Sequence, residues 1–252
     1  MRLITLTIFA VLLLALSVPA SADVGLADWC VNLNGNIDVC NAGAAPGGNA
    51  NVNVSAFDPT LETAGPNTLG SITVTIGTGV QYAAVYMDYD VNYSTWGSFT
   101  DVGSVNGSPS GSQSYELADP NTSNIFSDFS GAGPLPNSNT VDAATCAANS
   151  PAYCDVSWAL AESVFVDSTL YSGGVVTFTV STTAPTSGFY LQQTNGITSD
   201  TIYLSDTVNL TPLGSPAPTP EPTSVLLLAT TVVGVLVLRR RSSANRGVTF
   251  WS

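Results

Sequence analysis

The sequence predicts an all-β protein: a single β-sandwich of jelly-roll or immunoglobulin-like type, with a signal peptide before it and one transmembrane helix after it. Three observations predict this class. Residues 23–211 are rich in Gly, Ser, Thr, Asn and Val and poor in Lys, Arg, Glu and Gln, which favour helices. Apolar residues alternate with polar ones in several short runs, as in strands with one buried face. Asn-Gly dipeptides, which accept positive φ, mark turns.

The clearest expected strand is residues 71–76, where Ile and Val alternate with Thr. Other runs with strand-like composition are residues 80–93, 156–166, 175–182, 188–193 and 201–204. We expect turns at Asn34-Gly35, Asn106-Gly107 and Asn195-Gly196. Residues 101–142 are acidic and rich in Ser and Gly, which predicts long loops with at most a short strand at 113–117.

The N-terminal segment has the three parts of a secretory signal peptide. A basic start at Met1-Arg2 is followed by an apolar run over residues 3–16 and by the small-residue pattern Ala20-Ser21-Ala22. We therefore expect residues 1–22 to be removed and the domain that follows to be exported.

The four cysteines fall into two local pairs. In an oxidising compartment we expect disulfides between Cys30 and Cys40 and between Cys146 and Cys154. Four cysteines allow three pairings, and this choice depends on nearness in the chain alone. A zinc site is disfavoured because the spacings are wide and the chain has no histidine.

The charge inventory excludes several kinds of chemistry. All five basic residues lie in residues 1–22 or 239–246, so residues 23–220 carry seventeen of the eighteen acidic residues and no Lys, Arg or His. This excludes Ser-His-Asp and Cys-His catalysis, lysine nucleophiles and nucleic-acid binding. A glycosidase with two carboxylates needs no Lys, Arg or His and stays an alternative. Repulsion among the carboxylates predicts better resistance to urea at about pH 5 than at about pH 8, with salt or calcium narrowing the difference.

One short stretch is a candidate calcium site. In a strand, Asp88, Asp90 and Asn92 share one face, and three oxygen ligands together suit calcium. The stretch is not an EF-hand loop, because Tyr93 and Phe99 stand where that loop needs glycine and glutamate. A solvated polar strand face is the competing interpretation, and no cofactor other than calcium is expected.

Aromatic residues near this stretch allow two interpretations. Tyr82 and Tyr86 share the face of Asp88 and, with Trp96, form a candidate patch for stacking sugars. Trp158 is expected in the core instead, because its strand neighbours of the same parity, Val156 and Leu160, are apolar.

The C-terminal residues have the order of a membrane sorting segment. A proline-rich linker, residues 212–222, ends in Pro220-Glu221-Pro222, and an apolar run over residues 225–238 is followed by Arg239, Arg240 and Arg241. The run of fourteen residues is about 21 Å long as a helix, against a hydrocarbon core of about 30 Å, so flanking residues have to extend it. We expect a transmembrane helix over residues 223–241, with residues 242–252 held in the cytoplasm by the arginines.

This order of features resembles the PEP-CTERM sorting signal of Gram-negative bacteria, although the tail after the arginines is longer than usual. Residues 181–194, followed by residues 200–205, are also similar to the end of a group of uncharacterised PEP-CTERM ectodomains. The resemblance implies a precursor anchored in the inner membrane, processing by exosortase, and transfer to the cell surface or extracellular matrix. It also implies association with exopolysaccharide and biofilm. The expected function is therefore a non-enzymatic surface or matrix protein; the alternative is a secreted carbohydrate-binding module or a carboxylate-type glycoside hydrolase.

Overall fold

A computed structural model describes residues 24–40, 50–57, 69–91, 100–149 and 154–214. The chain divides into two compact units, Met1–Pro212 and Leu213–Ser252, and all described strands belong to the first. The expected signal peptide, the Pro220-Glu221-Pro222 motif, the apolar run and the three arginines lie outside the described residues. Within the described ranges, no helix is long and apolar enough to cross a membrane.

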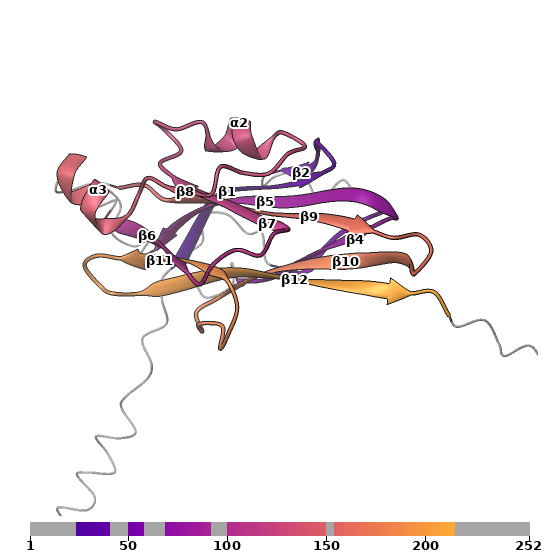
Figure 1. Cartoon of the computed structure of the whole chain (residues 1–252). Helices are drawn as coiled ribbons and strands as arrows, with labels where there is room; N and C mark the ends of the chain where they lie inside the picture. Colours follow the sequence, from indigo (N-terminus) through magenta and orange to yellow (C-terminus); the bar gives the residue numbers. More distant parts are fainter. Residues whose placement is uncertain (1–23, 41–49, 58–68, 92–99, 150–153, 215–252) are drawn as a thin grey trace, which may run out of the picture. The chain divides into compact units, whose positions relative to one another are not determined.

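The described strands form two facing sheets of six strands each (Figure 1). All pairings between strands are antiparallel except the short parallel pair of β7 and β8. The prediction of an all-β, two-layer fold is thus confirmed. In spatial order, the first sheet, here sheet A, consists of β2 (Asn36–Cys40), β1 (Val24–Leu33), β5 (Gly79–Val91), β9 (Ser157–Val166), β7 (Gln113–Ala118) and β8 (Ser138–Asn139). The second, sheet B, consists of β3 (Val52–Phe57), β4 (Gly70–Ile76), β10 (Tyr171–Ser181), β12 (Thr201–Pro212), β11 (Tyr190–Asn195) and β6 (Asp101–Asn106).

The main core lies between the two sheets and is built by alternate residues of their strands. Strand β5 contributes Met87, Tyr89 and Val91, as its alternation predicts. Trp158 of β9 is fully buried there, and its ring lies 5.8 Å from that of Tyr89, so its predicted core position is confirmed.

The outer face of sheet A is also buried in part, and this corrects the prediction of a sugar-stacking patch. Tyr82 and Tyr86 are each only 3% exposed, because the short helix α2 (Ile125–Phe129) and its flanking loops cover them. The ring of Tyr86 lies 5.4 Å from that of Phe126 and 5.9 Å from that of Phe129. Neither tyrosine is available to stack on a sugar, and Trp96 lies outside the described residues.

The prediction of mostly loops over residues 101–142 is wrong for β6, although β7 is confirmed. Gly103 and Ser104 make β6 hard to recognise in the sequence, because neither residue type favours strands. The strand nevertheless pairs with β11 along its whole length. A side chain at Gly103 would meet Val141 at 3.0 Å and Leu117 at 3.2 Å, so close packing favours glycine in this strand. Helix α3 (Ala143–Asn149) in the same part of the chain was also not predicted.

The expected turn at Asn34-Gly35 is confirmed. Both residues have positive φ, 55° and 82°, and they join β1 to β2 as a two-residue hairpin loop. Asn195-Gly196 lies in a wider loop between β11 and β12, where Asn195 Oδ1 accepts from the backbone N–H groups of Ile197 and Thr198. Gly107 follows β6 with φ of 78°.

Candidate functional site

Acidic side chains gather at the end of the sandwich where β5 ends and β9 begins. In the register of sheet A, Asp28 of β1 lies directly opposite Asp88 of β5, and Asp88 lies opposite Ser157 of β9. Like charges opposite one another on neighbouring strands are destabilising, and no basic residue exists in residues 23–220 to offset them. We call this region the acidic end; its members are Asp28, Asp88, Asp90, Asp101 and Asp155.

Burial, more than repulsion, sets the protonation of this group. Burial raises the pKa of Asp88 to about 8, the charge of Asp155 adds to the effect, and a hydrogen bond with Ser157 opposes it. Burial and then the charge of Asp90 raise the pKa of Asp155 to about 6. Burial raises the pKa of Asp28 and Asp90 as well. At neutral pH Asp88 therefore retains a proton, and the acidic end carries less than its formal charge.

Asp101 differs from the other members because hydrogen-bond donors surround its carboxylate. Its Oδ2 accepts from the backbone N–H of Val91 at 3.0 Å and from Gln193 Nε2 at 2.7 Å, while Oδ1 accepts from Asn195 Nδ2 at 2.9 Å. Gln193 and Asn195 also donate to the carbonyl oxygens of Tyr89 and Val91. Burial outweighs these donors and raises the pKa of Asp101 to about 6. The network joins β5 of sheet A to β6 and β11 of sheet B, so its role is structural.

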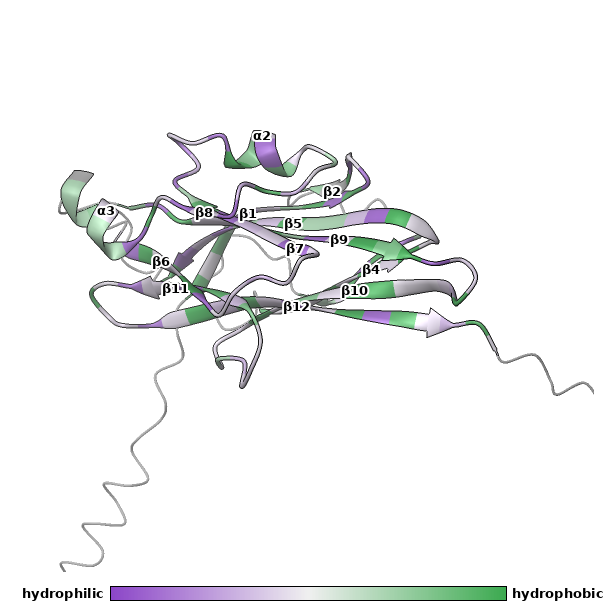
Figure 2. Cartoon of the chain, viewed as in Figure 1, coloured by the Kyte–Doolittle hydropathy of each residue, from purple (hydrophilic) through white to green (hydrophobic). Residues whose placement is uncertain are grey.

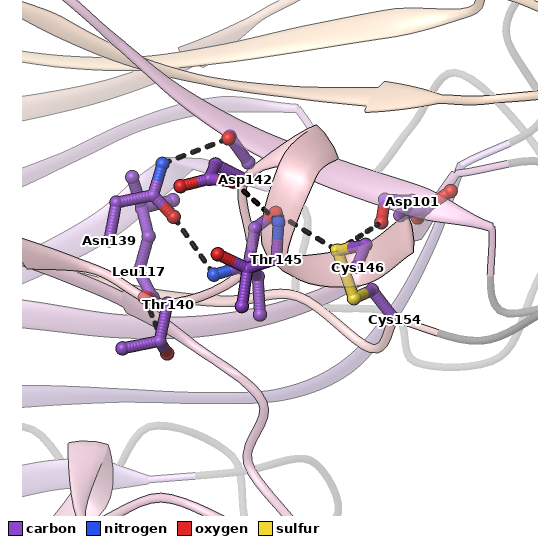
Figure 3. The surroundings of a disulfide bond; sticks show 10 residues. Asp101, Leu117, Asn139, Thr140, Asp142, Thr145, Cys146 and Cys154 are labelled. Atoms are coloured by element: carbon purple, nitrogen blue, oxygen red, sulfur yellow. Dashed lines mark hydrogen bonds between the residues drawn. A yellow bond between two sulfur atoms is a disulfide. The ribbon is translucent and has the colours of Figure 1, made fainter. Parts of the chain in front are cut away.

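A disulfide holds Asp155 at this end. Cys146 of α3 is bonded to Cys154, and Cys154 pairs with Thr100, directly before Asp101 (Figure 3). At the start of α3, Asp142 Oδ1 accepts from the backbone N–H of Thr145 at 2.8 Å. The second disulfide, Cys30 to Cys40, joins residues that lie opposite each other in β1 and β2. Both predicted pairings are confirmed.

The structure describes two of the three residues of the predicted calcium site, Asp88 and Asp90. Asp88 and Asp90 alternate with the core residues Met87, Tyr89 and Val91, so both lie on the outer side of β5 as expected. Asn92 lies outside the described residues. Among the described residues, no three acidic, Cys or His side chains are grouped closely enough to hold a metal ion. The sequence analysis did not identify Asp28 or Asp155 as neighbours, because strand register is not written in the local pattern.

A second carboxylate pair lies between the sheets, and the sequence analysis missed it. Glu162 of β9 is only 4% exposed and lies near Asp206 of β12. Glu162 Oε2 and Asp206 Oδ2 are buried and accept from no N–H or O–H donor among the described residues. Burial and a hydrogen bond to Asp206 raise the pKa of Glu162 to about 8, and Gln113 Nε2 donates to Asp206 Oδ1 at 2.9 Å. The two carboxyl groups therefore share one proton at neutral pH.

A third pair lies beneath α2. Glu116 of β7 is buried on the outer face of sheet A, and its Oε2 has no donor among the described residues. Burial, and then the charge of Asp128 in α2, raise the pKa of Glu116 to about 7. The packing of α2 on the sheet therefore depends on whether Glu116 is protonated.

Neither pair has the geometry of a glycosidase. Such enzymes hold two carboxyl groups about 5 to 9.5 Å apart with a sugar between them. Glu162 and Asp206 are instead hydrogen-bonded to each other in the interior, and α2 lies over Glu116.

No family model matches the chain, and no curated protein or solved structure is significantly similar to it.

Proposed function

We propose that the chain is a non-enzymatic protein of the bacterial cell surface or extracellular matrix, exported and then processed at its C-terminus by exosortase. Its precursor is held in the inner membrane of a Gram-negative bacterium by residues 223–241. The mature domain is released or transferred and associates with exopolysaccharide in a biofilm. We assign residues 23–211 to one ectodomain, a sandwich of jelly-roll or immunoglobulin-like type; two facing, mainly antiparallel sheets support that assignment.

The observation that carries this proposal is the acidic end on a domain without basic residues. Burial and the charges of Asp155, Asp90 and Asp28 all help to raise the pKa of Asp88, and residues 23–220 supply no cation to pair with these carboxylates. Because the described acidic side chains are not grouped closely enough to hold a metal ion by themselves, a divalent cation would take oxygen ligands from both the domain and an acidic polysaccharide, and would so join the domain to a matrix. Two disulfides are consistent with an exported protein.

The sorting part of the proposal is tested by the intact mass of the mature protein. We would recover the protein from the medium, the outer membrane and the matrix of its host, with and without exosortase. The expected mass runs from Asp23 to a cut at Pro220, Glu221 or Pro222 and is seen only when exosortase is present. An uncut C-terminus in both strains would mean that residues 223–241 are an ordinary anchor.

The matrix part is tested separately by calcium. We expect calcium together with an acidic polysaccharide to raise the unfolding midpoint of the full chain, and Asp88→Asn with Asp90→Asn to weaken the apparent affinity for calcium at least about tenfold. The control is Asp167→Asn, which removes a carboxylate that lies outside the acidic end. Equal calcium responses in all three proteins would contradict a cation site at the acidic end.

A secreted carbohydrate-binding module or glycoside hydrolase is not favoured by the described residues. The tyrosines expected to stack on sugars are buried, and the two further carboxylate pairs are in direct hydrogen-bond contact or covered by α2.

A further inference from the structure

Exposed apolar side chains gather at the end of the sandwich opposite the acidic end. Val80 is 78% exposed and Phe165 is 68% exposed, and the two are direct cross-strand partners in β5 and β9. Leu170, 57% exposed, lies in the turn from β9 to β10, where its backbone N–H donates to Asp167 O at 3.0 Å. We call these three residues the apolar tip. Apolar colour extends to the tip of β9 in Figure 2.

The apolar tip has no covering element among the described residues. The pairing of β1 with β5 ends at Leu33 and Ala83, and the pairing of β7 with β9 begins at Gln113 and Glu162. Beyond these positions sheet A consists of β5 and β9 alone. Helix α2 contributes to the buried cluster around Tyr82 and Tyr86, and this cluster includes no residue of the apolar tip.

The chain leaves the domain at this same end. Pro212, the last residue of β12, pairs with Tyr171, which directly follows Leu170. Only residues 215–224 separate the last described residue, Gly214, from the apolar run 225–238. Fully extended, that connection spans at most about 40 Å. Whatever holds the apolar run thereby also holds the apolar tip nearby.

The aspartates of the acidic end lie away from the apolar tip, at the other end of the sandwich. Asp88 and Asp90 lie eight and ten residues from Val80 along β5, which is about 26 to 33 Å in a strand. Near the apolar tip, the described acidic side chain whose carboxylate is exposed is Asp167, whereas Glu162, three residues before Phe165, is buried. The end tethered to the apolar run is therefore suited to a lipid surface, whereas anionic headgroups would repel the acidic end.

We propose that the apolar tip lies on the bilayer surface while the precursor is anchored, so that the acidic end is directed away from the membrane. This inference rests on the membrane anchoring in the proposed function. Three apolar side chains are too few for stable binding alone, and the tether supplies the high effective concentration that they need. Cleavage after the linker removes the tether, so the tip then dissociates from the lipid and the domain is free to enter the matrix.

Quenching of tryptophan fluorescence by brominated lipid tests the proposal. The full chain is reconstituted in vesicles of phosphatidylcholine with brominated acyl chains, once as Phe165→Trp and once as Ile197→Trp. Ile197 is a matched control, because it is 67% exposed and follows Asn195, which binds Asp101 at the acidic end. The emission of the unsubstituted chain is subtracted in each case.

We expect quenching of about half of the emission added at position 165, since interfacial side chains lie about 5 to 10 Å deep, and almost none at position 197. Equal quenching at both positions, in chains that float with the vesicles, would contradict a contact between the apolar tip and the bilayer. It would not contradict the membrane anchor. Chains that do not float with the vesicles would overturn the anchor and the inference with it. A blue-shifted, concentration-dependent emission at position 165 without quenching would mean that the tip binds a second copy of the chain, and would also overturn the proposal.

Discussion

Asp101 and Glu162 are both buried carboxyl groups, but their surroundings differ. Asp101 accepts three hydrogen bonds from N–H donors, and its pKa rises only to about 6. Glu162 lies beside a second carboxyl group, Asp206, and its pKa rises to about 8. In a domain without basic residues, a buried carboxylate is stabilised by N–H donors where the backbone and amides supply them, and by a retained proton where they do not.

The largest expected consequence concerns the whole domain and its pH dependence. Asp88, Glu116 and Glu162 have folded pKa values of about 8, 7 and 8, above unfolded values of about 4. Because the folded state binds more protons, stability is fully present below about pH 4 and is lost as pH rises to about 8. We expect the free energy of unfolding in urea to be lower at about pH 8 than at about pH 4 by at least several kcal/mol.

The effect of salt distinguishes burial from charge repulsion as the cause of the stability lost at high pH. The sequence analysis attributed the loss of stability at high pH to repulsion among carboxylates, which salt screens strongly at exposed sites. In the structure burial is the first cause for all three groups, so we expect salt to restore only a small part of the stability lost at pH 8. Full recovery in about 1 M neutral salt would contradict burial as the main cause.

The next largest effect is expected for Asp101→Asn. The new amide group would face N–H donors that now bind a carboxylate oxygen, and at least one of Val91, Gln193 and Asn195 would lose its acceptor. We expect a loss of about 2 to 4 kcal/mol in urea unfolding at neutral pH. A loss below about 0.5 kcal/mol would show that the donors do not need this carboxylate.

Glu162→Gln is expected to change stability in the opposite direction. The amide can donate to Asp206 without a proton from solvent, so we expect a gain of roughly 1 to 3 kcal/mol at about pH 8 and little change at about pH 4. The control is Asp167→Asn, whose carboxylate is exposed, has a lowered pKa and accepts from the backbone N–H of Thr169. That variant should show no gain at either pH. A loss at pH 8 for Glu162→Gln would contradict the shared proton.

The smallest effect is expected for Glu116→Gln. Its carboxyl group lies next to Asp128 of α2, so the substitution removes the repulsion that grows above about pH 7. We expect slower hydrogen exchange of the α2 amides at pH 8, with a global gain below about 1 kcal/mol. Unchanged exchange in α2, measured at the same global stability, would show that the pair does not influence the docking of the helix.

Local pattern was sufficient for much of the fold. Alternation predicted the strand at residues 71–76 and the inward face of β5, because one side of each strand packs in the core. The positive φ required at Asn34-Gly35 predicted a hairpin, and short separation predicted both disulfides.

What sequence pattern could not supply was contact between distant segments. Tyr82 and Tyr86 were interpreted as exposed because a helix of five residues is too short to give a periodic signal, yet α2 covers them. Glu162 and Asp206 are 44 residues apart, and only the packing of one sheet on the other brings them together. The acidic end likewise depends on the register that places Asp28 opposite Asp88.

Carbon-13 NMR titration of the side-chain carboxyl groups tests the retained protons most directly. In the folded full chain we predict that Glu162, buried beside a second carboxyl group, titrates near pH 8, and that Asp101, buried among N–H donors, titrates near pH 6. The single variants Glu162→Gln and Asp101→Asn each assign one signal by its loss. Titration of both groups at about pH 4, the value of exposed carboxyl groups, would contradict the account.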